Sequence, residues 1–197
     1  PDHHRFKEYY MDDLASAMRK ETHVFFRHLL DNNLPTSEFL TAQYTFANPA
    51  LARLYHLPVE KSDFPNPDSF IRVSTEGHPR GGLLGHSSIH TVTANRVDTS
   101  PIIRGVWLLE NILGTPPSPP PPDIEPIEPD TRGSTTIRDQ MERHRSDPTC
   151  AECHRKIDPL GFALENFDAI GRYRSTYGPR KKIDASGVLP GGQEFNS

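Results

Sequence analysis

The stretch Cys150-Ala151-Glu152-Cys153-His154 is the most informative part of this chain, because it fits the attachment site of a c-type haem. Two thiols separated by two residues can each form a thioether bond to one haem vinyl group, and the histidine that follows then lies beneath the iron as an axial ligand. The chain has 197 residues and only two cysteines, and both belong to this stretch. We therefore expect one covalent haem c, attached to Cys150 and Cys153, with His154 as the ligand of its iron.

Two other kinds of site use the same residue types. A zinc ion bound by Cys150, Cys153, His154 and His144 would have the required four ligands. Structural zinc sites usually separate their ligand pairs by a long loop, however, and the adjacent Cys153 and His154 would crowd one metal ion. A thioredoxin-like redox pair needs a strand in front of it, whereas Asp147-Pro148-Thr149 precedes this motif and no apolar strand leads in. The residues therefore favour haem.

Charge and hydropathy exclude several other functions. The formal net charge is −4 with a pI near 6.2, and no basic block stands out. Nucleic-acid binding therefore has no electrostatic basis in this sequence. No apolar run approaches the ~20 residues that a membrane-spanning helix requires. Covalent haem attachment normally takes place outside the cytoplasm, so we expect an extracytoplasmic location, in the periplasm or at the cell surface.

Proline content predicts the class of fold. The chain contains 20 prolines and 34% hydrophobic residues, which indicates a mainly α fold of short helices and long Pro-rich loops, packed around the haem, with little β structure. Eight prolines fall within residues 116–129, where we expect extended polyproline II. We expect a helical N-terminal region over 1–75 and a haem c-binding, cytochrome-like region over 76–197.

Local patterns predict the individual elements. An amphipathic helix is expected over 12–30, because apolar residues recur there near the helical period. Asn48 and Ser100 are good N-caps in front of Pro49 and Pro101 at the first helical position. The complete set of expected elements is helices over 12–30, 37–41 (capped by Thr36), 49–55, 101–113, 136–145 and 160–170, the last ended by Gly171, and one short strand over 70–73.

The second axial ligand of the iron must lie at a different place in the sequence from the one it has in an ordinary small cytochrome c, where a methionine downstream of the motif binds the iron. No methionine and no histidine follows His154, so a ligand from this chain must come from upstream. Met141 and His144 are too close in sequence to wrap easily onto the opposite face of the haem. His86 is the favoured candidate and His90 the alternative, because both are distant enough to fold over that face. An open or non-protein sixth site remains the other alternative.

The sixth ligand decides which function the motif supports. Two strong axial ligands favour one-electron transfer, whereas an open site lets peroxide or another small molecule reach the iron. Arg80 and Arg104 are candidates for contacts with the haem propionates or with a ligand on the distal side. No catalytic residue is assigned.

The chain resembles the large planctomycete-type cytochrome-like proteins, which are multidomain and are catalogued as domains of unknown function. The resemblance covers nearly the whole chain. It implies haem attachment at Cys150 and Cys153 with His154 as ligand, within a larger exported protein. The motifs that carry it are Tyr44-Thr45-Phe46-Ala47-Asn48, Leu51-Ala52-Arg53-Leu54-Tyr55, Arg80-Gly81-Gly82-Leu83-Leu84-Gly85, Thr99-Ser100-Pro101, Arg104-Gly105-Val106-Trp107, Leu113-Gly114, the proline run, Cys150 to His154, and Asp158-Pro159-Leu160-Gly161-Phe162-Ala163-Leu164-Glu165-Asn166-Phe167-Asp168.

Three functions follow as hypotheses. The first is an electron-transfer module that works with a redox partner protein or with fused oxidoreductase domains. The second is a peroxidase-like or small-molecule-binding haem enzyme with an open distal site. The third is an interaction domain, for a carbohydrate or a surface, in which the haem is structural.

Overall fold

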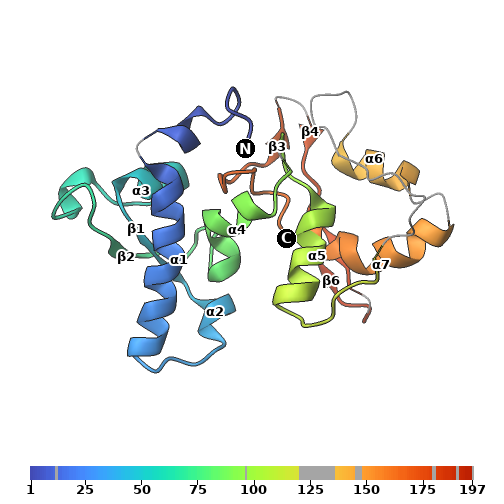
Figure 1. Cartoon of the computed structure of the whole chain (residues 1–197), viewed down its shortest axis with the longest axis horizontal. Helices are drawn as coiled ribbons and strands as arrows, with labels where there is room; N and C mark the ends of the chain where they lie inside the picture. Colours follow the sequence, from blue (N-terminus) through green and yellow to red (C-terminus); the bar gives the residue numbers. More distant parts are fainter. Residues whose placement is uncertain are drawn as a thin grey trace. The chain divides into compact units, whose positions relative to one another are not determined.

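The computed structural model describes residues 1–11, 13–95, 97–119, 136–144, 148–178, 181–189 and 191–196, without the side chains of residues 140, 143, 144 and 148–150. It contains two compact units, which we describe separately (Figure 1). The first unit comprises residues 1–92 and 170–173, and the second comprises residues 93–169 and 174–197. The chain thus divides after Val92, whereas the sequence suggested a boundary near residue 75. Most of the predicted polyproline II segment, from residue 120 onward, lies outside the described residues.

The first unit is built on one long helix that packs against a two-stranded antiparallel sheet. Strand β1 pairs with strand β2 in a register that places Tyr44 opposite Ser74, and Phe25 and Leu29 of helix α1 pack against the apolar face with Ala42, Tyr44 and Phe46. The elements of this unit, in chain order, are η1 (Lys7–Tyr10), α1 (Leu14–Asp31), α2 (Glu38–Thr41), β1 (Tyr44–Ala47), α3 (Pro49–Tyr55), η2 (Lys61–Asp63), β2 (Ile71–Ser74), η3 (Leu83–Gly85) and α4 (Ser87–Val92).

A buried carboxylate links the elements of the first unit. The side chain of Glu21 on α1 is fully buried. It accepts hydrogen bonds from Thr45 Oγ1 of β1 and from Tyr55 Oη of α3, both at 2.6 Å. The Tyr55 hydroxyl in turn accepts a bond from the backbone N–H of Ser87, at the start of α4. Because a buried charge is tolerated only with such partners, this cluster fixes four elements relative to one another.

Within its described residues, the second unit contains three helices and two short hairpins. The helices are α5 (Pro101–Asn111), α6 (Ile137–His144) and α7 (Pro148–Phe162), and the strands are β3 (Thr176–Tyr177), β4 (Lys181–Lys182), β5 (Gly187–Val188) and β6 (Glu194–Phe195). Strand β3 pairs with β4, and β5 pairs with β6, in antiparallel fashion. Ile137 and Met141 of α6 pack against Phe162 of α7 in the core of this unit.

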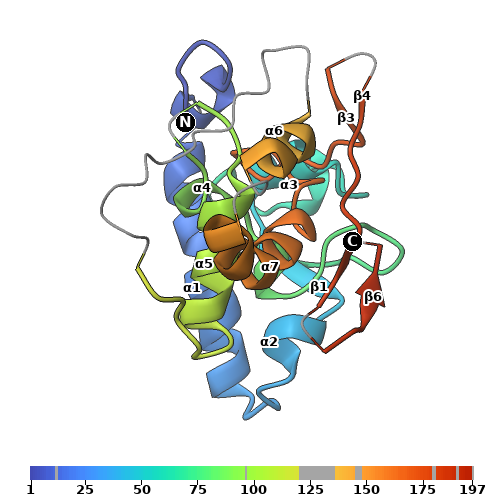
Figure 2. The same cartoon turned by 90° about the vertical axis from the view of Figure 1, so that its right-hand side faces the viewer.

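Helices α5 and α7 lie side by side in both views and approach each other unusually closely (Figures 1 and 2). A Cβ atom at Gly105 of α5 would lie 2.1 Å from the carbonyl oxygen of Ile157, and one at Gly161 of α7 would lie 1.8 Å from the carbonyl oxygen of Pro101. Each glycine therefore meets the backbone of the other helix. No larger residue could be accommodated at either position without moving the two helices apart.

The structure confirms most of the expected elements and corrects others. Helices α1, α3, α5 and α6 and strand β2 occur where the sequence predicted them, and Asn48 and Ser100 accept the capping hydrogen bonds. Ser37, rather than Thr36, is the residue in front of α2. The helix expected over 160–170 is wrong, because α7 runs from Pro148 to Phe162 and the chain then turns.

The observed class is mixed rather than purely helical. The structure is 44% helical and 12% strand, and the strands form small antiparallel sheets. The predicted mainly α fold is therefore only loosely consistent with it. Strand β1 was not expected, and two-residue strands such as β3 and β5 are too short to produce an alternating pattern. Among the described residues, none of the helices combines the length and the hydropathy needed to cross a membrane.

The substitution Gly105→Ala tests the close contact between α5 and α7. We expect it to lower the free energy of unfolding of the second unit by about 1–3 kcal/mol, because the added methyl group overlaps the backbone of α7. Alanine has the higher helix propensity, which would otherwise make the change stabilising. Denaturant unfolding measures the difference. Glu110→Ala, at an exposed position of the same helix, is the control and should leave the stability nearly unchanged.

Candidate functional site

The cysteines and histidine of the CxxCH motif (Cys150–His154) lie within the first half of helix α7. Positions 150, 153 and 154 are separated by three and four residues, so they share one face of the helix. Cys153 is exposed and forms no disulfide. The side chain of Cys150 lies outside the described part of the structure. A helix that begins at Pro148 therefore brings the three chemically active positions of the motif together.

The imidazole of His154 is held by a carboxylate one turn further along α7. His154 Nδ1 lies 2.8 Å from Asp158 Oδ1, and the side chains are 14% and 1% exposed. A carboxylate can only accept a hydrogen bond, so Nδ1 carries the proton and donates it. Any metal ion bound by His154 would therefore use Nε2. Metal-ligating histidines commonly have such an oriented second nitrogen, so these residues fit the proximal side of a haem.

A cavity of about 690 Å³ runs along the neighbouring face of α7. Its wall includes Asp158 and Phe162 from α7 and Val188 from β5. Two arginines, Arg138 and Arg155, also line it. Arg138 forms an ion pair with Asp184 at 3.3 Å, and Arg155 forms one with Glu152 at 2.8 Å. Its volume is in the range typical of small-molecule sites, and it extends as far as the carboxylate that orients His154.

The segment after α7 is held in place by the side chain of Arg104 on α5. The fully buried guanidinium donates to the carbonyl oxygens of Leu164 at 2.8 Å, Phe167 at 2.9 Å and Asp168 at 3.1 Å. It also lies 3.4 Å from the buried carboxylate of Glu165. Burial lowers the pKa of Arg104, and Glu165 opposes this effect. Arg104 therefore turns the chain at the end of the helix that carries the motif.

A second arginine completes this buried network. Arg174 lies 2.9 Å from Glu165 and 3.3 Å from Asp98, both of which are fully buried. Burial works against the charge of Arg174, but the two carboxylates outweigh it and raise its pKa. Burial and the nearby Glu165 also raise the pKa of Tyr177, which keeps its hydroxyl neutral. The second unit therefore contains two guanidinium and two carboxylate groups that neutralise one another.

Arg80, the other predicted haem contact, lies in the first unit and is buried there. Its guanidinium donates to the carbonyl oxygens of Gly85 and Gly171 and lies over the ring of Tyr55, 3.5 Å from the ring centroid. Arg80 and Arg104 thus each form buried hydrogen bonds within their own unit. Whether either residue also contacts a haem propionate or a distal ligand stays a prediction.

The two candidates for the sixth ligand, His86 and His90, are buried residues of the first unit. Nδ1 of His86 lies 3.1 Å from Thr22 Oγ1, and its ring packs edge-on against Phe25. Burial lowers the pKa of His86, so its imidazole is neutral, as a metal ligand must be. Nε2 of His86 has no hydrogen-bond partner among the described residues. The motif belongs to the second unit, so the identity of the sixth ligand stays a prediction.

The zinc alternative concerns side chains that lie partly outside the described residues, namely those of Cys150 and His144. Within the part of the chain that the structure describes, no three His, Cys, Asp or Glu side chains come close enough together to hold a metal ion.

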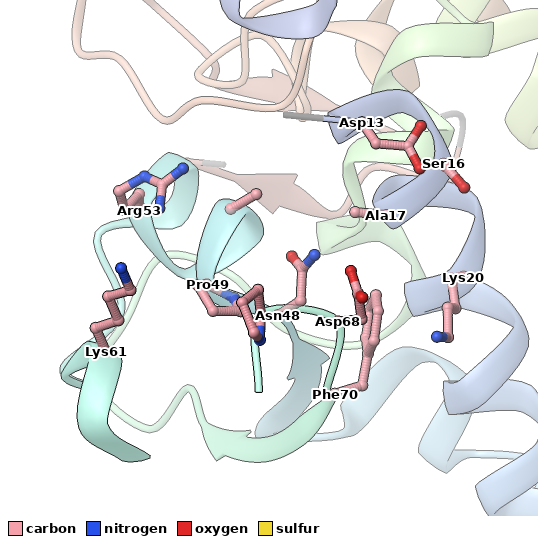
Figure 3. Close-up of a pocket in the computed structure, with 12 residues that line it drawn as sticks. Asp13, Ser16, Ala17, Lys20, Asn48, Pro49, Arg53, Lys61, Asp68 and Phe70 are labelled. Carbon is pink, nitrogen blue, oxygen red and sulfur yellow. The ribbon is translucent and has the colours of Figure 1, made fainter. Parts of the chain in front are cut away.

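The first unit has its own cavity, of about 430 Å³, between α1, the start of α3 and the loop before β2 (Figure 3). Charged side chains of both signs line it: Asp13, Lys20, Arg53, Lys61 and Asp68. Lys20 Nζ lies over the ring of Phe70, 4.9 Å from the ring centroid. Asp13 precedes α1 in a left-handed conformation (φ 52°), and its side chain does not cap the helix. The carboxylate of Asp13 is therefore available to the cavity.

The sequence predicted no role for Asp158, Glu165 or Glu21, although Asp158 and Glu165 lie in one of the motifs that carry the family resemblance. Asp158 follows His154 by four residues, which is the spacing of neighbours on a helix. This spacing would have predicted the contact between the two side chains if a helix had been expected to begin at the motif. Glu165 and Glu21 are buried acids whose partners are distant in sequence, so no local pattern points to them.

Two family models match the chain. Residues 1–57 match PSD4, described as a protein of unknown function (DUF1592), and residues 80–177 match PSCyt3, described as a protein of unknown function (DUF1588). Both are planctomycete-type cytochrome-like domain families of unknown function. Their succession along one chain indicates a fused-domain protein. No curated protein and no solved structure matches the chain.

Replacing Arg104 tests whether it is a structural clamp. We expect Arg104→Met to lower the free energy of unfolding by about 3–5 kcal/mol, because Glu165 and three carbonyl oxygens lose a buried partner. Arg155→Met, which removes an exposed ion pair on α7, is the matched control and should have little effect. Equal stability of the two variants in denaturant unfolding would contradict this role of Arg104.

Proposed function

We propose that this chain is a c-type cytochrome module that carries one covalent haem and transfers single electrons as part of a larger exported redox protein. Bound haem would supply an iron that alternates between the ferric and ferrous states. The observation that supports this proposal best is the arrangement of α7, where Cys153, the backbone of Cys150 and His154 share one helical face and a buried carboxylate orients the imidazole. The similarity to cytochrome-like domain families points in the same direction.

Each residue of the site has a separate role in this proposal. Cys150 and Cys153 would form the thioether bonds and thereby fix the haem to α7. His154 would bind the iron through Nε2, while Asp158 holds Nδ1 and so fixes the orientation of the ring. Arg104 anchors the far end of the same helix through the carbonyl groups of residues 164–168. A helix anchored in this way would change little between the two redox states, which favours electron transfer.

The location and the partners belong to the same proposal. Thioether formation requires a compartment in which haem is attached to exported chains, so the protein functions in the periplasm or at the cell surface. Its electron donor or acceptor is a redox partner protein or an oxidoreductase domain fused to it.

Maturation of the chain in a host that attaches c-type haem tests the proposal directly. The intact mass should increase by one haem, and the double variant Cys150→Ala/Cys153→Ala should lose this increase. His154→Ala should keep the covalent haem but change its absorption spectrum, because the iron loses a protein ligand. His28→Ala, at a partly buried position of α1 in the first unit, is the matched control and should leave the mass increase and the spectrum unchanged.

Two results would overturn the proposal in different ways. A wild-type chain without added mass would exclude a covalent haem altogether. A covalent haem with a high-spin ferric spectrum that responds to cyanide or peroxide would instead favour the peroxidase-like alternative, because simple electron transfer needs no open coordination position.

As a second candidate function, we propose that the first unit binds a sugar acid in the 430 Å³ cavity of Figure 3. Asp13 and Asp68 offer acceptors for hydroxyl groups, and Lys20 and Lys61 can neutralise a carboxylate. Within the described residues, Asp13, Asp68 and Lys61 have no ion-pair partner. Mixed donors and acceptors around a cavity of this size suit a polyhydroxylated ligand. This candidate is a form of the interaction-domain hypothesis, with ligand binding assigned to the first unit alone.

Calorimetric titration with glucuronate, and with glucose as the neutral comparison, tests the second candidate. Glucuronate should bind more tightly than glucose, and Lys61→Gln should weaken its binding about tenfold, because a charge-assisted hydrogen bond is lost. Lys7→Gln, at an exposed position outside the cavity, is the control. The haem-free double cysteine variant should bind glucuronate as the wild type does. Equal binding of the two sugars, or equal effects of the two lysine changes, would contradict the assignment.

A further inference from the structure

We propose that Asp158 is a positioning residue that gives the proximal ligand His154 anionic character and thereby lowers the reduction potential of the iron. This inference rests on the proposed haem function and specifies how the chain would regulate that site. The structural basis is the pairing of an imidazole and a carboxylate on one helix, with 2.8 Å between His154 Nδ1 and Asp158 Oδ1.

The surroundings of the pair make this hydrogen bond strong and fixed. Asp158 is 1% exposed and His154 is 14% exposed, so water competes weakly for either group and the effective dielectric is low. Both residues lie on α7, four positions apart, so the helix itself sets their separation. The carboxylate therefore has little freedom to turn away from the imidazole when the redox state changes.

Two arginines near Asp158 have acidic partners of their own. The 690 Å³ cavity that Asp158 lines also contains Arg138, Arg155 and Glu142. Arg138 is bound to the carboxylate of Asp184 and donates to the carbonyl oxygens of Asp184 and Ser186. Arg155 is paired with Glu152. Among the described residues, neither arginine forms an ion pair with Asp158, and the 2.8 Å contact with Nδ1 of His154 is the interaction on which the inference rests.

The electronic consequence follows from the direction of the hydrogen bond. When Nδ1–H donates to a carboxylate, electron density shifts toward Nε2, and the histidine becomes a more basic ligand. A more basic ligand stabilises ferric iron over ferrous iron, because the oxidised form carries the greater positive charge. Hydrogen bonding to an axial ligand is one of the ways in which a protein sets a haem potential. A neutral acceptor in place of Asp158 would have a weaker effect.

The variant Asp158→Asn removes the negative charge but keeps an oxygen that can accept from Nδ1–H. We expect the ratio of ferrous to ferric protein at a fixed applied potential to rise about tenfold, which corresponds to a positive shift of about 59 mV for a one-electron couple. Spectroelectrochemical titration of the matured holoprotein gives this potential. A purely structural role would alter stability and leave the midpoint potential in place.

Two further variants make the result specific. Glu142→Gln removes a negative charge from the wall of the same cavity without touching the imidazole, so its potential should shift much less than that of Asp158→Asn. Asp158→Glu keeps the charge but changes the reach of the side chain, so its shift should be intermediate. If Asp158→Asn does not mature, the comparison of Asp158→Glu with Glu142→Gln decides the question.

Failure of the inference is distinguishable from failure of the proposed function. The intact mass of the wild-type chain shows first whether haem is attached. If haem is present and the Asp158 variants have the potential of the wild type, or shift no more than Glu142→Gln, the role of Asp158 is wrong while the cytochrome function stands. If haem is absent from the wild type, both proposals are wrong.

Discussion

The buried guanidinium of Arg104 is the interaction on which the second unit depends. Burying a charged group away from water costs free energy unless hydrogen bonds or an opposite charge compensate for it. Here three carbonyl oxygens and the carboxylate of Glu165 provide that satisfaction. All of these acceptors belong to the turn that follows α7, so the arginine on α5 defines how α7 ends. The glycines at 105 and 161 then allow the two helices to touch backbone to backbone.

This anchoring produces a gradient of burial along α7. Near its C-terminal end, Phe162 and Ile157 are buried in the core. Toward the N-terminal end, His154 is partly exposed and Cys153 is exposed. The anchored end supplies rigidity, and the exposed end leaves a thiol accessible to chemistry. A covalent attachment site needs both properties, because the thiol must be reached before the bond forms and the ligand must stay in place afterward.

The sequence predicted the elements with strong local signals and missed those that depend on distant partners. Asn48-Pro49 and Ser100-Pro101 are cap and first-turn pairs, and both open helices as expected. The end of α7 was predicted incorrectly because apolar residues continue to Ile170, whereas Arg104 supplies the turn from a helix more than 50 residues earlier. The spacing of Cys150, Cys153 and His154 predicts haem attachment, which stays a prediction. The supporting residue Asp158 became apparent only when α7 was seen to include both His154 and Asp158.

Each unit contains buried carboxyl groups that are hydrogen-bonded or paired by residues of the same unit. The proposed functions of the two units can therefore be considered separately. In the first unit, Glu21 is satisfied by Thr45 and Tyr55. None of these groups belongs to α7, and the cavity beside α1 is also lined entirely by residues of the first unit. Folding of the first unit and its proposed ligand binding therefore need not depend on the haem attachment proposed for the second unit. The redox and ligand-binding proposals are thus physically independent, so one can fail without affecting the other.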